Sequence, residues 1–469
     1  MRARPALAVA LLVVLAGCGG TVGGPEPAGA TPTGTPTGTP IGTPTATPTA
    51  EPREPFADPA TDRLGWEAGR WHDEPLAVNA SDGLNRSERS AVVARTMARV
   101  ERLRGLEFES TVPVEVVDRE TYLARETVTA TAFDETVWEA LLLIGEDRSV
   151  ASVFESFYGA SVQGSYVPSE DRIVLVSDGE GARIDRRTLA HELVHALQDQ
   201  HFGVDRGTLT RDERLARQGL IEGDAGYVED LYERRCRGGN WTCVPRPDAG
   251  PGASLGGDMG VYVAAYQPYS DGPAFVHRLR QRGGWAAVNA AYANPPTSSA
   301  QVIHPERYPN WSAERVRIPD RSASNWSRLN HTPTGTTVGE ASLFATMWAN
   351  GGVETFHLQR PSRPHRAYNY THPTTAGWVG DRLVPYRNAE GERGYVLRIR
   401  WATDGDAAAF AVAYRRLLRE RRGAERRAGD VLVVPAGPYA DAFRVRREGR
   451  TVTVVNAPTV GALASVHAG

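Results

Sequence analysis

The stretch between Asp185 and Gly203 constrains the fold more than any other part of the chain. It reads RRTLAHELVHALQDQH, and residues such as Leu189 and Leu193 recur at the spacing that forms one apolar stripe on a helix. Asp185 is suited to cap the start of such a helix, and Gly203 is suited to end it. The sequence therefore predicts an amphipathic helix over residues 186–201.

Two histidines of this predicted helix, His191 and His195, are spaced as the pattern HExxH. Four residues of an α-helix turn through about 400°, so both imidazoles project from one face, one turn apart. That geometry suits two nitrogen ligands of one Zn²⁺ ion. Glu192, rotated by about 100°, can act as a general base on a water at the metal without ligating it. The alternative is an amphipathic helix with two surface histidines.

A catalytic zinc site needs a third protein ligand, and His201 is one of two candidates. It follows His191 at the spacing of the pattern HExxHxxGxxH, but Gln198 stands where that pattern has glycine. Glutamine is a good helix former, so the helix is expected to continue and to carry His201 past the metal face.

Glu222 is the other candidate, and the one we favour over a solvated helix charge. It lies in a second predicted helix, over residues 212–235, next to Gly223 and close to Gly226. Glycine disfavours a helix, so these two positions suggest close approach to another backbone. The HExxH helix is the expected partner, and this approach would bring the Glu222 carboxylate to the metal.

The sequence also contains candidates for residues that surround such a metal site, and each has an alternative structural interpretation. Asp199 follows His195 by one turn and is expected either to orient its ring or to be a surface charge. Asp224 and Glu229 are open to the same two interpretations. A tetrahedral oxyanion also needs a donor, and each candidate for it has a structural role as the alternative. These candidates are His304, Tyr308 and Tyr269.

The N-terminus has the pattern of a targeting segment. Arg2 and Arg4 precede an apolar run over residues 6–16, which is shorter than a membrane-spanning helix and typical of a signal peptide. The run ends in LAGC, which resembles a lipobox, so residues 1–17 are predicted to be a lipoprotein signal peptide and Cys18 to carry lipid. A plain signal peptide with an incidental cysteine is the alternative.

Residues 18–55 form a Thr/Pro/Gly-rich stalk that reads TPTGTPTGTPIGTPTATPTAEP in its central part. Such a sequence can bury almost nothing and favours an extended, polyproline-like chain. A lipid anchor followed by a stalk predicts a protein held at the membrane, on the extracellular face of the cell.

Two further features agree with an extracellular location. Cys236 and Cys243 lie close together in sequence, and a small-loop disulfide is their natural interpretation in an oxidising compartment. Asn-x-Ser/Thr sequons, each a weak signal, predict a glycoprotein. They begin at Asn79, Asn85, Asn240, Asn310, Asn325, Asn330 and Asn369.

Charge excludes several functions. All 53 basic residues are arginine, so chemistry that depends on a lysine, such as a P-loop or a Schiff base, is absent. The net charge is −3 and the chain has no basic block, which argues against nucleic acid as a partner.

The remaining pattern predicts an α+β protein. A zincin-like domain over residues 56–330 is expected to combine a mixed sheet with the HExxH helix and the ligand helix, followed by a smaller α+β region of unknown role over residues 331–469. Further elements are expected as helices at 88–104, 273–279, 338–350 and 407–419, as one long helix or a helix pair at 124–143, and as strands at 111–117, 161–167, 172–176, 431–435, 442–447 and 451–455.

Longer blocks carry a family resemblance. TLAHELVHALQDQHF followed by LIEGDAGYVE, with PYSDGPAFV, PPTSSAQVIHPERY and GWVGDRL, resembles the zincin class of metallopeptidase-like proteins and is similar to haloarchaeal cell-surface lipoproteins. The resemblance implies a zincin-like fold in which His191, His195 and Glu222 bind Zn²⁺ and Glu192 is the catalytic base.

The expected function is therefore a surface-tethered zinc-dependent peptidase that hydrolyses extracellular polypeptides. The alternative is a non-catalytic cell-surface or envelope protein with a degenerate or structural zinc site.

Overall fold

The structure is a computed structural model, and it describes residues 12–15, 58–79, 83–125, 127–177, 183–203, 207–247, 258–427 and 429–468. The predicted lipidation site Cys18 and the predicted stalk lie outside these residues. Of the predicted signal peptide, only the backbone of residues 12–15 is described. No helix in the described ranges is both long enough and apolar enough to cross a membrane.

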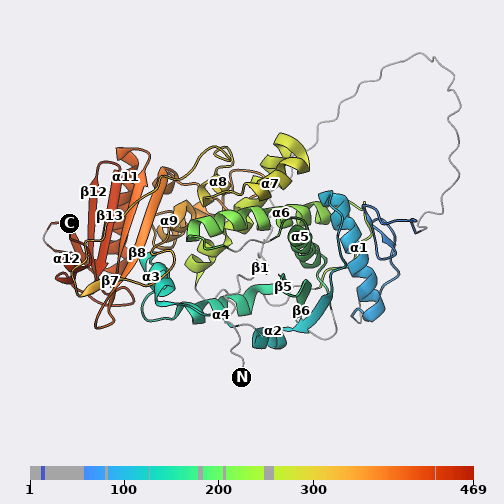
Figure 1. Cartoon of the computed structure of the whole chain (residues 1–469), viewed down its shortest axis with the longest axis horizontal. Coiled ribbons are helices and arrows are strands. Elements are labelled where there is room, and N and C mark those ends of the chain that lie inside the picture. Colours follow the sequence, from blue (N-terminus) through green and yellow to red (C-terminus); the bar gives the residue numbers. More distant parts are fainter. Residues whose placement is uncertain are drawn as a thin grey trace, which may run out of the picture.

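The chain forms a mixed α+β structure, as predicted (Figure 1). The elements up to the predicted ligand helix are β1 (Leu12–Leu15), β2 (Trp66–Glu67), β3 (Arg70–Trp71), α1 (Arg86–Arg104), β4 (Val114–Asp118), α2 (Arg119–Arg125), α3 (Ala132–Ala140), α4 (Val150–Ser161), β5 (Val162–Val167), β6 (Arg172–Ser177), α5 (Arg186–Phe202) and α6 (Arg211–Arg237). The later elements are α7 (Met259–Ala293), α8 (Ser299–Ile303), β7 (Trp326–Arg328), α9 (Gly339–Ala349), the 3₁₀ turn η1 (Thr355–His357), α10 (Pro373–Ala376), β8 (Trp378–Asn388), β9 (Arg393–Trp401), α11 (Asp404–Arg422), β10 (Glu425–Arg426), β11 (Val431–Val433), β12 (Ala442–Glu448), β13 (Thr451–Ala457) and α12 (Ala462–Val466).

The first sheet is mixed and lies next to the HExxH helix α5. Its strand order is β1-β5-β6-β4, with β5 and β6 antiparallel and β4 parallel to β6. The strands predicted at 161–167 and 172–176 are thereby confirmed as β5 and β6. At the outer edge of β5, the backbone of β1 pairs antiparallel, with Leu12 opposite Tyr166 and Leu15 opposite Val162. β5 therefore presents an edge that accepts an extended segment.

The second sheet has seven strands in the order β10-β11-β12-β13-β9-β8-β7 and lies at the end of the molecule opposite α1 (Figure 1). Its longest pair, β8 and β9, was not predicted. Charged residues such as Asp381, Arg382 and Arg398 interrupt the apolar pattern of these strands. Asp381 is nevertheless buried, because it accepts hydrogen bonds from the backbone amides of Val338 and Gly339.

Of the two alternatives for residues 124–143, the structure has a helix pair, but its bounds differ from the prediction. α2 begins earlier, at Arg119, and α3 begins only at Ala132, with residues 127–131 non-helical. Thr131 starts α3 as the N-cap of a capping box: its side chain accepts from the amide of Asp134, whose own carboxylate accepts from the Thr131 amide. This local hydrogen bonding competes with a continuous helix and ends it.

The two predicted regions share one hydrophobic core. Trp138 and Phe157 from the first region belong to the same buried cluster as Phe344, Trp378 and Phe410 from the second. The two predicted regions therefore pack against each other through this cluster. α6 runs between the end of the molecule that carries α1 and the end that carries the seven-stranded sheet, as Figure 1 shows.

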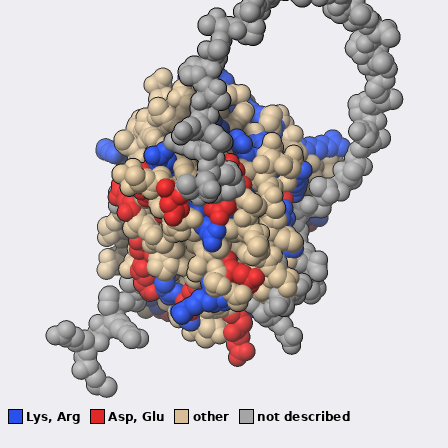
Figure 2. Space-filling model, turned by 90° about the vertical axis from the view of Figure 1, so that its right-hand side faces the viewer, with Lys and Arg blue, Asp and Glu red and all other residues tan. Residues whose placement is uncertain are grey.

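α1 is attached to the rest of the molecule through two buried arginines. Arg104 forms an ion pair of 2.9 Å with Asp224 of α6 and lies over the ring of Trp285. Arg99 lies 4.7 Å from the ring centre of Trp241. A planar guanidinium is suited to combine an ion pair with ring stacking. On the surface at this end, basic and acidic side chains are interspersed (Figure 2).

α6 approaches α7 at closely spaced glycines. A Cβ atom added to Gly223 would lie 2.4 Å from the carbonyl oxygen of Gly272, and one added to Gly272 would lie 2.4 Å from the carbonyl oxygen of Gly219. The prediction that Gly223 and Gly226 face the HExxH helix is wrong: Gly223 faces α7, and a Cβ on Gly226 would lie 3.2 Å from Pro273 of α7. The helix period explains the error, because Gly223 is rotated by about 100° from Glu222.

The predicted disulfide between Cys236 and Cys243 is confirmed. It joins the last turn of α6 to the segment that carries Trp241, the residue under the Arg99 guanidinium. The bond therefore closes a short loop beside the contact between α1 and α6.

We expect removal of this disulfide in a Cys236→Ser/Cys243→Ser variant to lower the free energy of unfolding by about 2–3 kcal/mol, because a short loop restricts the unfolded chain only modestly. Denaturant titration measures this change. Reductant should destabilise the wild type by a similar amount and leave the double variant unaffected. Equal stability of the two proteins would contradict the prediction.

Candidate metal centre

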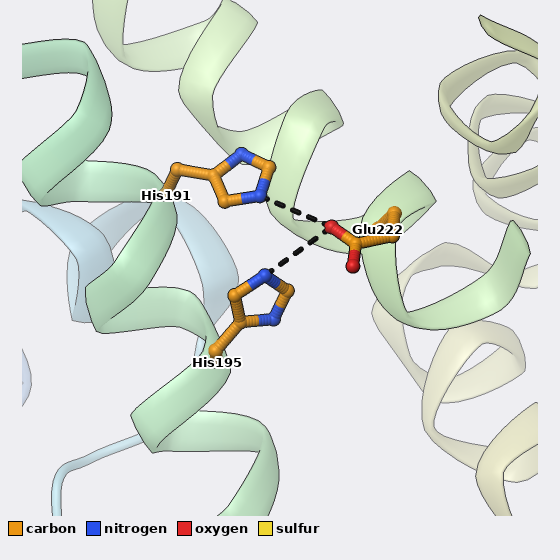
Figure 3. A group of neighbouring side chains, drawn as sticks. All are labelled: His191, His195 and Glu222. Atoms are coloured by element: carbon orange, nitrogen blue, oxygen red, sulfur yellow. Dashed lines mark hydrogen bonds and ion pairs between the residues drawn. The ribbon is translucent and has the colours of Figure 1, made fainter. Parts of the chain in front are cut away.

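His191, His195 and Glu222 converge on one point between α5 and α6 (Figure 3). The Nε2 atoms of both histidines lie 3.3 Å from the same oxygen, Oε2 of Glu222. One ligand atom from each residue lies within 4.8 Å of the other two, and no other group of this kind was found among the described residues. All three side chains are buried, with at most 2% of each residue exposed.

Local sequence positions α5 and α6. Asp185 caps α5 by accepting from the backbone amides of Arg187 and Thr188, and the helix ends at Gly203, as predicted. α6 begins with a capping box between Thr210 and Glu213. The starts of both helices are therefore capped by residues close in sequence, and the start of α6 also donates to Thr336 and Thr337.

The strand β5 packs against the HExxH helix α5. A Cβ atom added to Gly164 of β5 would lie 2.8 Å from Thr188 and 3.3 Å from Cγ of Glu192. Glycine at this position lets the strand approach α5 closely. Glu192 therefore lies between the metal-binding face of α5 and the β5 strand.

Each histidine is oriented through its second ring nitrogen. His191 Nδ1 lies 3.0 Å from Oε2 of Glu229, and His195 Nδ1 lies 2.9 Å from Oε1 of Gln198. The Gln198 amide in turn donates to the carbonyl oxygen of Ile221, the residue before Glu222. Such contacts direct both Nε2 atoms toward a shared ion.

The structure corrects the prediction for Asp199. Its carboxylate accepts a hydrogen bond from the Tyr166 hydroxyl at 3.0 Å. The ring of His195, which Asp199 was a candidate to orient, contacts Gln198 through its Nδ1 atom instead. Helical geometry explains this, because Gln198, three residues after His195, lies close to the same helix face. Asp224, which pairs with Arg104, likewise has a structural role.

His201 lies away from the three converging residues, as the continuing helix predicts. Its Nε2 atom is 2.7 Å from the carbonyl oxygen of Glu107. α5 extends through this position to Phe202, so Gln198 does not break the helix.

Of the three candidates for stabilising an oxyanion, only Tyr269 adjoins the site. Burial and the neighbouring Glu222 carboxylate raise the pKa of the Tyr269 hydroxyl well above the usual value, so the hydroxyl remains protonated and able to donate. His304 instead pairs with Glu340 at 2.8 Å. The Tyr308 hydroxyl donates to the carbonyl oxygen of Asn294. These last two predictions are corrected to structural roles.

The electrostatics of the site favour a bound cation. Burial alone would raise the pKa of Glu222, but the two histidines lower it to about 2. Burial alone would lower the pKa of His191, but Glu222 and Glu229 raise it to about 10. Burial raises the pKa of Glu192 to about 7. Two carboxylates thus stabilise positive charge at His191, and a carboxyl group titrating near neutrality lies beside it.

The donor set fits zinc. Two imidazole nitrogens and one carboxylate oxygen form a usual ligand set of catalytic zinc, which leaves a fourth position for water or substrate. Two features fit an ion and a water at this site: both carboxylate oxygens of Glu192 are buried without a hydrogen-bond partner among the described residues, and so is His195 Nε2.

Comparison with known proteins gives little further identification. Residues 327–467 match the model of a family described as a domain of unknown function (DUF8575). This match begins close to the predicted boundary at residue 331 and does not include the metal-centre helices α5 and α6. No curated protein and no solved structure matches the chain.

Proposed function

We propose that the chain is a zinc-dependent peptidase of the zincin type, in which His191, His195 and Glu222 hold the metal. The observation that carries the proposal is the convergence of these three side chains from two helices. The mixed sheet with the HExxH helix next to the β5 strand, followed by a ligand helix, supports the zincin-like assignment.

Glu192 would act as the general base. Zinc, when bound, supplies a Lewis acid that polarises the peptide carbonyl and lowers the pKa of water. The Glu192 carboxylate accepts the proton of the attacking water and delivers it to the leaving nitrogen, so that it ends the cycle unchanged. A pKa of about 7 suits a group that must both accept and donate this proton.

A polypeptide substrate would bind along β5. The backbone of Leu12–Leu15 already adds to this edge as an antiparallel strand, which is the way an extended peptide pairs with an open sheet edge. Because residues 1–17 are expected to be removed as a signal peptide, we infer that the edge becomes available to substrate. Gly164 places that edge beside Glu192.

The location of the enzyme is part of the proposal. The LAGC run and the Thr/Pro/Gly-rich stalk support a lipid anchor at Cys18 and a catalytic domain held on the extracellular face of the membrane.

The proposed metal centre is tested with two alanine variants. We expect Glu222→Ala to weaken zinc binding by at least about 100-fold, because it removes one of three protein ligands. The control, His201→Ala, should bind zinc as the wild type does, because His201 contacts the Glu107 carbonyl instead. Competition with a chromogenic chelator measures both affinities. Unchanged affinity in Glu222→Ala would reject the ligand set.

A non-catalytic protein with a structural zinc site is the second candidate. The burial of His191, His195 and Glu222 favours it, because catalytic zinc needs an accessible fourth position. Cleavage of a broad peptide library by the zinc-loaded protein distinguishes the two functions, and several salt concentrations should be sampled.

A further inference from the structure

A groove of about 590 Å³ lies on the seven-stranded sheet, remote in sequence from the proposed metal ligands. Val384 of β8 and Ile318 contribute apolar surface to it. These two residues belong to a different core cluster from Leu383 and Phe410, so the groove is on the face of the sheet opposite α11. Four arginine residues also line this groove, which we call the arginine groove. They are Arg315, Arg317, Arg328 and Arg382.

Most of this positive charge is not neutralised. Arg328 pairs with Asp320 at 3.3 Å. Among the described residues, no carboxylate forms an ion pair with any of the other three arginines of the groove.

A further arginine adds to the same face. Arg398 of β9 lies directly opposite Arg382 in the antiparallel ladder, so the two side chains project from the same face of the sheet. Arg398 donates to the backbone carbonyl oxygen of Arg317, which leaves the charge of both residues in place. Like charges directly opposite each other destabilise a sheet, so the arrangement reduces stability unless an anion is present.

Burial increases this cost at Arg382, whose side chain is only partly exposed. Desolvation lowers its pKa, and the charges of Arg328 and Arg315 lower it further against the opposing effects of Asp381 and Glu213. Asp381 cannot neutralise the groove fully, because it accepts from two backbone amides and from Trp378, and burial raises its pKa to about 7.

We propose that the arginine groove binds a compact organic anion that carries two or more oxyanion groups: carboxylate, sulfate or phosphate. Guanidinium forks bind such groups through paired hydrogen bonds, and several forks in one groove select for more than one group. The volume is in the range of small-molecule sites and exceeds what one inorganic ion needs. Val384 and Ile318 offer contact to the body of the ligand.

To test this proposal, benzene-1,3-disulfonate is titrated into the zinc-bound full chain at low ionic strength, and binding is followed by calorimetry. We expect saturable binding that is at least tenfold tighter than that of benzenesulfonate, which has one charge, and that weakens with added salt. Glutarate, fructose 1,6-bisphosphate and a disulfated disaccharide then identify which oxyanion is preferred. Equal, unsaturable binding of the mono- and disulfonate would overturn the proposal.

Arg382→Gln is the decisive variant, and Arg447→Gln is its matched control. Arg447 is exposed at the end of the same sheet, and its side chain bonds to the Gly449 carbonyl outside the groove. We expect Arg382→Gln to lose at least tenfold in affinity for the disulfonate. The melting temperature of the probe-free protein should not fall, because the substitution removes the repulsion between Arg382 and Arg398. Arg447→Gln should bind as the wild type does. A lower melting temperature with unchanged affinity in Arg382→Gln would assign Arg382 a structural role and overturn the proposal. Equal losses of affinity in both variants would also overturn it, because Arg447 lies outside the groove.

Discussion

Replacement of Glu192 by glutamine should leave zinc bound and slow peptide hydrolysis by about 1,000-fold. Glutamine keeps the shape of the side chain but cannot accept the proton of the attacking water, and general-base catalysis contributes on the order of 10²–10⁴ in rate. In free energy, the activation barrier should rise by about 4 kcal/mol. Steady-state cleavage of a peptide found in the library, together with metal analysis of the same sample, measures both quantities.

The control for this substitution is Glu155→Gln, which changes the same chemical group at an exposed position of α4. It should cleave at the wild-type rate. If Glu192→Gln loses its zinc, Glu192 is a ligand and the assignment of Glu222 must be revised. If it cleaves at the wild-type rate, the proposed peptidase mechanism is wrong.

Gly223→Ala should destabilise the protein by about 3 kcal/mol. The added methyl group would lie 2.4 Å from the carbon and the oxygen of the Gly272 carbonyl, and backbone atoms cannot move aside as a flexible side chain can. α6 and α7 must then separate. Because α7 carries Tyr269 and α6 carries Glu222, we also expect weaker zinc binding. Denaturant titration and the chelator competition measure the two effects.

Substitutions of two other glycines serve as controls for Gly223→Ala. Gly226→Ala adds a methyl group 3.2 Å from a side-chain carbon of Pro273, so it should have a much smaller effect. Gly405→Ala, in the first turn of α11, meets only the Thr403 hydroxyl at 3.5 Å and should leave stability unchanged or slightly raised. A Gly223→Ala protein as stable as these two would show that the helices separate without cost.

The parts of the site that the sequence predicts well depend on local physics. The α5 helix follows from its cap at Asp185 and its end at Gly203, and the helix period alone places His191 and His195 on one face. Glu222 needed a tertiary argument. The flanking glycines did indicate a close helix contact, but their partner is α7, because a sequence pattern cannot identify which backbone approaches.

Other features of the site and the fold were not predicted from the sequence pattern. Gln198 was treated only as a departure from a glycine pattern, although its spacing of three residues from His195 is the signal that it can reach the ring. Glu229, by contrast, was one of the candidate orienting groups, and its spacing of two turns from Glu222 places it on the same side of α6. β8 was missed because Asp381 breaks the apolar run, and its burial depends on amides more than 40 residues away in the chain.

The core shared by both halves of the chain has a consequence for how the protein unfolds. Residues 327–467, taken alone, would expose to water the faces of Phe344 and Trp378 that now pack in one cluster with Trp138 and Phe157. Because this cluster joins the two regions, we expect the metal centre and the arginine groove to unfold together as a single cooperative unit. Heating should melt them in one transition, and a ligand bound at either site should raise the midpoint of both.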